Sequence, residues 1–180
     1  RLERETKERI AKGDFKGAYP FMSVLIRDFP NRPGLRELRC DFLWLDAIAR
    51  AKRKELAPTL AMLEELRRYA PEYKRSLVLD AIGRTTDQLM QQLMDGGDLD
   101  LAQKMLARLQ KDYANDNLQS IKKWNAEFLR MATAKQNEAK AALEAKDYRL
   151  ARKLSRESVY LKPDIPGGIE LVKLVDRIYP

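Results

Sequence analysis

The sequence has 180 residues, enough to bury one continuous hydrophobic core or to form one stack of small helical repeats. Hydrophobic residues make up 44% and charged residues 34%, which excludes a disordered chain, and no uncharged apolar run is long enough to span a membrane. The net charge of +8 favours acidic partners, and it concentrates in residues 1–54, where 14 basic residues outnumber 8 acidic ones.

Both ends of the chain predict a piece cut from a longer protein. Arg1 opens a stretch of helix-like composition with no secretory signal, and the chain stops at Ile178-Tyr179-Pro180. The single cysteine, Cys40, allows no internal disulfide, so we interpret it as a small residue packed between helices. The cellular compartment is left open by these features.

Glycine and proline are scarce and separate long segments that have the periodicity of helices rather than strands. The sequence therefore predicts an all-α fold of about nine helices, in one domain over residues 1–180. The expected helices cover residues 1–12, 15–29, 35–53, 56–69, 72–95, 99–113, 117–145, 148–161 and 168–178.

Three of these segments carry apolar residues at steps of three and four, the spacing that aligns side chains on one face of a helix. We expect each series to face the core. The series are Leu35, Leu38, Phe42, Leu45 and Ala49; Tyr73, Leu77, Ala81, Thr85, Leu89 and Leu93; and Ile121, Trp124, Phe128, Ala132, Ala139 and Leu143. Pro71 is expected in the first turn of the second segment, and Asn115-Asp116 precede the third.

The shorter segments between them share one internal pattern. An acidic residue is followed by an apolar one, then by a small residue three positions later, and by proline or alanine twelve positions after that. The copies are Asp14-Phe15, Ala18 and Pro30; Glu55-Leu56, Thr59 and Pro71; Asp98-Leu99, Ala102 and Ala114; and Asp147-Tyr148, Ala151 and Pro163. The acidic residue is expected to cap a helix, the small residue to permit close helix approach, and proline to end the segment.

This pattern resembles the tetratricopeptide repeat. Gly13-Asp14-Phe15-Lys16-Gly17-Ala18 and Gly97-Asp98-Leu99-Asp100-Leu101-Ala102 are similar to that family's inter-helix turn and second-helix start, and Lys146-Asp147-Tyr148 with Pro163 forms a third copy. The resemblance implies a stack of antiparallel helix pairs, an α-α superhelix, with pairs at about 1–30, 35–70, 72–114 and 117–162. Residues 168–178 would form a capping helix over the last pair.

The sequence departs from the family in three ways. Its copies lie 41, 43 and 49 residues apart, longer than the family's period of about 34, so the first helix of each pair is expected to be lengthened. Leucine stands at Leu25, Leu66 and Leu109, where a small residue is usual. Pro20 interrupts a helical segment, which either kinks there or begins nearer Ala18.

No constellation for catalysis is apparent. The chain has no histidine, and its glycine pairs belong to no phosphate-binding motif, so we expect no enzyme activity, cofactor or metal. The closest carboxylate pairs, Glu64 with Glu65 and Asp98 with Asp100, are interpreted as solvated charges or helix starts.

The resemblance implies instead a protein- or peptide-binding scaffold, whose groove is lined by the first helix of each pair. Candidate contacts for an acidic or backbone-rich peptide are Arg36, Arg39, Arg50, Tyr73, Arg84, Lys122, Lys123, Asn125 and Arg130. Trp44 and Trp124 could anchor a partner, although both lie in apolar runs that favour core packing.

Two other functions stay open at this stage. The basic N-terminal part, with Arg50, Lys52, Arg53 and Lys54 close together, could bind nucleic acid through phosphate contacts, although acidic residues are interspersed and no recognition motif accompanies it. The chain could also be a structural or assembly appendage of a larger bacterial protein. The oligomeric state follows from neither pattern.

Overall fold

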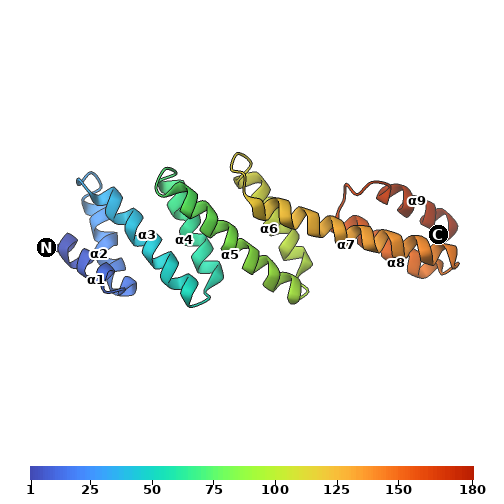
Figure 1. Ribbon diagram of the computed structural model, residues 1–180, viewed down its shortest axis with the longest axis horizontal. Helices are drawn as coiled ribbons and strands as arrows, with labels where there is room; N and C mark the ends of the chain where they lie inside the picture. Colours follow the sequence, from blue (N-terminus) through green and yellow to red (C-terminus); the bar gives the residue numbers. More distant parts are fainter. The chain divides into compact units, whose positions relative to one another are not determined.

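A computed structural model describes residues 1–180 and contains nine α-helices and no strand, with 79% of the chain helical (Figure 1). The helices are α1 (Leu2–Ala11), α2 (Phe15–Asp28), α3 (Leu35–Lys52), α4 (Leu56–Tyr69), α5 (Arg75–Asp95), α6 (Leu99–Asp112), α7 (Gln119–Glu144), α8 (Tyr148–Leu161) and α9 (Gly168–Ile178). Neighbouring helices pack in pairs, α1 with α2, α3 with α4, and α7 with α8. The predicted all-α fold of packed helix pairs is confirmed.

The chain forms two compact units, residues 1–92 and residues 93–180, and the boundary between them falls within α5. We describe each unit by itself. None of the helices combines the length and apolar composition that crossing a membrane requires.

Two helices begin two or more residues later than the sequence predicts. The expected start at residue 72 is wrong because Pro71 lies in a turn, which the Tyr73 N–H closes by donating to the Ala70 carbonyl at 3.0 Å. Lys74 then takes a left-handed conformation, with φ 43°, and α5 begins at Arg75. The other helix, α7, begins at residue 119 rather than 117.

The four second helices, α2, α4, α6 and α8, each have 14 residues, and each begins after the same kind of turn. The residue before the acidic position is left-handed in all four turns: Gly13 (φ 73°), Lys54 (φ 60°), Gly97 (φ 77°) and Lys146 (φ 61°). The next N–H, from Asp14, Glu55, Asp98 or Asp147, donates to a carbonyl five residues earlier at 2.8–3.1 Å. This bond satisfies a carbonyl at the end of the first helix, so the turn both ends one helix and starts the next.

The small residue of each copy is buried where two helices meet. Ala18, Ala102 and Ala151 are fully buried and Thr59 is 1% exposed, as predicted. Ala151 on α8 lies in one hydrophobic cluster with Ala139 and Ala142 of α7 and with Leu171 and Val175 of α9. Alanine is needed on both sides of such a contact because larger side chains would keep the two helix backbones apart.

Capping by the acidic residue is confirmed in two of the four copies. Asp14 accepts the Gly17 N–H at 2.9 Å, and Asp147 accepts the Leu150 N–H at 3.1 Å. The prediction is wrong for Glu55 and Asp98, whose side chains make no cap hydrogen bond. The Glu55 carboxylate instead binds two arginines of the preceding turn.

Pro20 lies inside α2, which begins at Phe15, so the alternative of a helix that begins nearer Ala18 is wrong. Proline has no N–H to donate, and the Lys16 carbonyl therefore loses its usual partner one turn earlier. The proline side chain is exposed, which leaves the buried face of α2, with Ala18, Met22 and Leu25, undisturbed. Leu25, at a position where tetratricopeptide repeats usually have a small residue, is fully buried here.

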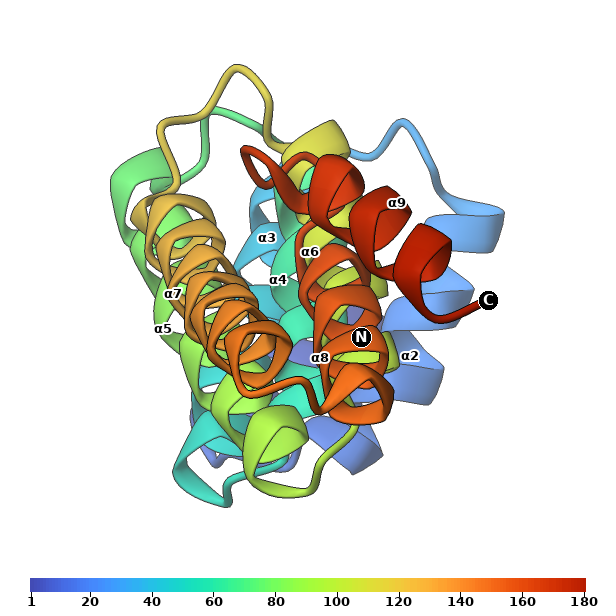
Figure 2. The same cartoon turned by 90° about the vertical axis from the view of Figure 1, so that its right-hand side faces the viewer.

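In the second unit, α8 packs against both α7 and α9 (Figure 2). Two long-range hydrogen bonds tie these elements together. The Ser158 hydroxyl donates to the Ala132 carbonyl at 2.8 Å, and the Gln136 amide donates to the Pro166 carbonyl at 2.9 Å, just before α9. As a result, both the middle of α7 and the loop that leads to α9 are held in place.

The left-handed lysines of the turns before α4 and α8, Lys54 and Lys146, offer a stability test. Replacing Lys146 with glycine should raise the free energy of unfolding by about 0.5–1 kcal/mol, because relief of the left-handed strain exceeds the added flexibility of the unfolded chain. Urea denaturation followed by circular dichroism measures the change. The control is Lys140→Gly on the exposed side of α7, which should lower stability by about 1 kcal/mol. A loss of stability in both variants would contradict the assignment of strain at Lys146.

Candidate functional site

Two of the predicted groove arginines are engaged with carboxylates of the same unit. Arg36 Nη2 lies 2.5 Å from Glu72 Oε1 at the approach to α5, and Arg39 Nη2 lies 3.1 Å from Glu65 Oε1 on α4. The Arg39 guanidinium also stacks 4.1 Å from the centre of the Tyr69 ring. Arg39 therefore leans toward a second helix and away from the face where a groove of first helices would lie.

Tyr73 and Arg84 also have partners. The Tyr73 hydroxyl donates to Asp41 Oδ1 at 2.5 Å, which joins the start of α5 to α3. Burial and this hydrogen bond raise the pKa of Tyr73, so the hydroxyl stays protonated and keeps donating. Arg84 pairs with Asp80 at 2.8 Å on the exposed side of α5. Of these two contacts, only the Tyr73–Asp41 hydrogen bond joins α3 to the segment before α5.

The two predicted lysines of α7 differ in their surroundings. Lys122 is exposed, and Lys123 lies with its ammonium 5.2 Å from the centre of the Trp124 ring. Trp124 is 3% exposed, which confirms that it belongs to the core. Trp44, the other tryptophan, is half-buried under Lys74, whose ammonium lies 5.6 Å from its ring centre.

Asn125 faces the second helix α6 rather than an open groove. Its Oδ1 accepts from Gln110 Nε2 at 3.0 Å, and both line a cavity of about 260 Å³ together with Gln103 and Phe128. Arg130, by contrast, forms an ion pair on its own helix, with Glu127 at 2.6 Å. The structure thus does not bring the candidates of α7 into one cluster.

Two leucines that the sequence assigns to the core are exposed instead. Leu45 is 41% and Leu77 is 55% exposed. Leu45 lies one turn beyond Asp41 on α3, and Leu77 lies in the first turn of α5, which starts just after Tyr73. We call Asp41, Leu45, Tyr73 and Leu77 the leucine face, since each leucine follows one partner of the Tyr73–Asp41 hydrogen bond by four residues along the chain.

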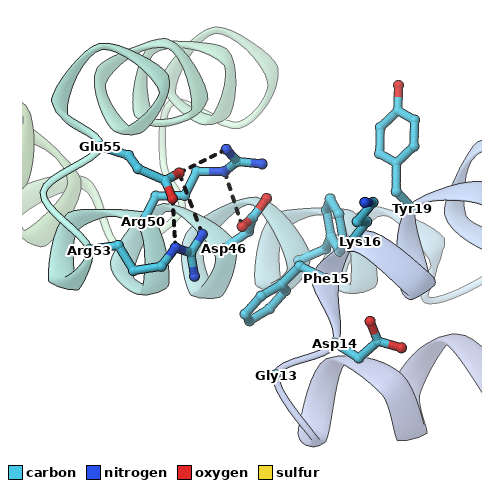
Figure 3. Close-up of a pocket in the computed structure, with 10 residues that line it drawn as sticks. Gly13, Asp14, Phe15, Lys16, Tyr19, Asp46, Arg50, Arg53 and Glu55 are labelled. Atoms are coloured by element: carbon cyan, nitrogen blue, oxygen red, sulfur yellow. Dashed lines mark hydrogen bonds and ion pairs between the residues drawn. The ribbon is translucent and has the colours of Figure 1, made fainter.

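A cavity of about 580 Å³ in the first unit lies between the α1–α2 turn and the α3–α4 turn (Figure 3). One wall is aromatic. Phe15 meets Phe42 edge to face with ring centres 6.1 Å apart, and Tyr19 lies tilted against Phe42 at 6.5 Å. Lys16 lies on the same helix as Phe15 and Tyr19. We call this cavity the turn pocket.

The opposite wall of the turn pocket is a chain of ion pairs, drawn as dashed lines in Figure 3. Arg50 bridges Asp46 at 3.2 Å and Glu55 at 3.1 Å, and Arg53 binds the same Glu55 at 2.6 Å. Asp46 is 4% exposed, so its charge needs this arginine nearby. The hydrogen bond from Arg53 lowers the pKa of Glu55, which keeps the carboxylate ionised.

The carboxylates of Asp14 and Glu55 in this pocket are held in their ionised form. General acid catalysis near neutral pH needs a carboxyl of raised pKa, whereas hydrogen bonds lower the pKa of Asp14, Glu55 and also of Asp100 outside the pocket. No group of three or more side chains is arranged to hold a metal ion. The sequence predicted Arg50 as a candidate contact but did not predict the aromatic wall. Phe15 was identified only as a position of the repeated pattern.

Comparison with known proteins identified no relative of this chain. No protein-family model matches the sequence, and no curated protein matches it significantly.

Proposed function

We propose that this chain is a non-enzymatic scaffold of the tetratricopeptide-like kind, which binds a protein or peptide along the exposed sides of its first helices. The observation that carries the proposal is the leucine face, where Leu45 and Leu77 stay largely exposed on α3 and α5. Burial of such side chains is a main source of binding free energy, and these two lie on successive first helices, where a lengthwise ligand would meet both.

Polar groups at this face could orient a bound peptide. Tyr73 and Asp41 bond to each other, and Arg84 and Asp80 form an exposed ion pair on α5. Such groups can exchange these bonds for bonds to a peptide backbone at modest cost, because exposed ion pairs contribute little to stability. A partner would thus gain its affinity from apolar contact and its orientation from the polar rim.

A panning experiment tests the proposal. Random peptides displayed on phage are selected on the immobilised chain, and an enriched peptide is measured by fluorescence polarisation. The double variant Leu45→Gln/Leu77→Gln should weaken this peptide about 30-fold, since roughly 1 kcal/mol is lost at each half-exposed leucine. Circular dichroism should show unchanged helicity.

The matched control is Leu101→Gln/Leu150→Gln, which changes two leucines of similar exposure on the second helices α6 and α8. This control should leave the affinity within about twofold, because these leucines lie outside the leucine face. Failure to enrich any peptide, or an equal loss in the control, would remove the proposal. If no peptide is enriched and a generic nucleic-acid duplex binds strongly, the nucleic-acid alternative is favoured. Self-association that depends on concentration would favour an assembly role.

A further inference from the structure

The turns at one edge of the first unit carry lysines that the fold does not use. Four lysines in or beside the α1–α2 and α3–α4 turns are exposed and have no carboxylate partner: Lys12, Lys16, Lys52 and Lys54. Arg50 and Arg53, in the same segments, are held by Asp46 and Glu55. The arginines thus stabilise the fold through ion pairs, whereas the lysines are available to bind a ligand.

Lys16 lines the turn pocket, and Lys12, Lys52 and Lys54 directly adjoin lining residues in the chain. The pocket is apolar on the side of α2. Phe15 is half-buried and Phe42 is buried, but Tyr19 is 63% exposed and can cover an inserted side chain. The space of about 580 Å³ falls within the roughly 300–1,000 Å³ that is usual for ligand clefts. A large apolar side chain with its flanking backbone fits such a volume.

The inner charges of the pocket are already balanced. Asp46 and Glu55 are neutralised by two guanidinium groups, so the deep wall attracts neither sign strongly. The one lining charge without an ion-pair partner is Lys16, and the unpaired Lys12, Lys52 and Lys54 beside the lining residues in the chain add further positive charge. A complementary ligand is therefore negative at its ends and apolar in its middle.

We propose that the turn pocket docks an acidic peptide segment that carries one aromatic or large aliphatic residue. The apolar residue enters beside Phe15 and Tyr19, and flanking carboxylates pair with Lys12 and Lys16 on one side and Lys52 and Lys54 on the other. This inference shares with the proposed function only the class of partner, a peptide, and it concerns a different surface from the leucine face.

The pocket favours a peptide over a nucleic acid. The guanidinium forks best suited to phosphate already bind carboxylates. Single strands also need successive stacking platforms, whereas Tyr19 alone presents a largely exposed ring here. A peptide can alternate charge with apolar contact, as this pocket requires.

The test uses short fluorescein-labelled peptides of glutamate and aspartate with phenylalanine at the centre, measured by anisotropy over a salt series. Replacing the central phenylalanine with alanine should weaken binding about tenfold, because the buried ring contact is lost. Tyr19→Ala should weaken the phenylalanine peptide several-fold and leave the alanine peptide unchanged. Affinity should fall as salt rises, since exposed charge pairs are screened.

The quadruple variant Lys12→Gln/Lys16→Gln/Lys52→Gln/Lys54→Gln should weaken the peptide about tenfold or more and flatten its salt dependence. Its matched control is Lys111→Gln/Lys140→Gln/Lys146→Gln/Lys173→Gln. These are four exposed lysines of the second unit without a carboxylate partner, one of them also in a left-handed turn. The control should keep both the affinity and the salt dependence.

An equal loss in the control, or no effect of the central phenylalanine, would overturn the inference. So would tighter binding of a single-stranded oligothymidylate of equal charge at the same salt concentration. If panned peptides depend on Leu45 and Leu77 while the acidic peptide ignores the four lysines, the proposed function stands and the pocket inference falls. If the acidic peptide depends on the lysines but no panned peptide depends on the leucines, the opposite holds.

Discussion

Replacement of Phe128 with alanine is expected to lower the free energy of unfolding by about 3–5 kcal/mol. The phenylalanine is 2% exposed on α7 and lines the small cavity with Leu106 of α6 and Leu161 of α8. Its ring therefore lies where three helices of the second unit meet, and its removal would leave a cavity there. Urea denaturation followed by circular dichroism measures the loss.

The neighbouring residue provides the control. Leu129 follows Phe128 on α7 but is 41% exposed. Leu129→Ala removes apolar atoms that water already reaches, so the expected loss is below about 1 kcal/mol. Similar losses for the two variants would show that the ring of Phe128 does not lie at the centre of this core.

Ala151→Leu is expected to destabilise the chain by about 3 kcal/mol, at the upper end of the range for overpacking. Ala151 is fully buried, and it faces Ala139 and Ala142 of α7 as well as Val175 of α9. Three extra carbons would have to push α8 away from a helix on either side. The thermal midpoint and the urea midpoint should both fall.

Arg149→Leu is the matched control for this change. Arg149 is an exposed residue of α8, and arginine and leucine have similar helix propensities. The control introduces the same side chain without crowding and should change stability by less than about 0.5 kcal/mol. If Ala151→Leu were as harmless, the small position of the repeat would not be a site of close helix contact.

The turns were predictable from sequence because their cause is local. Gly13 and Gly97 before an acidic residue indicate a left-handed end to a helix, and the small residue four positions after the acidic one marks a close contact. Lys54 and Lys146 fill the same backbone role without glycine's freedom, so only the repeated spacing revealed them. Local patterns therefore located every helix to within a few residues.

The buried face of a first helix was harder to predict. On α3 the buried residues include Leu38 and Phe42 but also Leu43, Asp46 and Ala47. Because α3 packs against both α2 and α4, its buried arc is wide, and the residue at 45 falls just outside it. A single series at steps of three and four cannot locate the centre of so wide an arc.

Partners of charged residues could not be predicted at all. Arg36 reaches Glu72 and Arg39 reaches Glu65, over separations of 36 and 26 residues. These pairs depend on how neighbouring helices are set against each other, which no short pattern encodes. The same limit hid the turn pocket, whose walls join residues of α2 to residues of α3 and of the turn that follows it.

The second helices all have the same length, so the helix pairs differ in length only through their first helices. A helix of 14 residues measures about 21 Å, whereas α3, with 18 residues, measures about 27 Å and α7, with 26 residues, about 39 Å. A ligand lying lengthwise on α7 could thus extend its contact by about 12 Å, or some three or four further residues of extended peptide, relative to one on α3. Two ligands of different reach could be told apart by helix length alone.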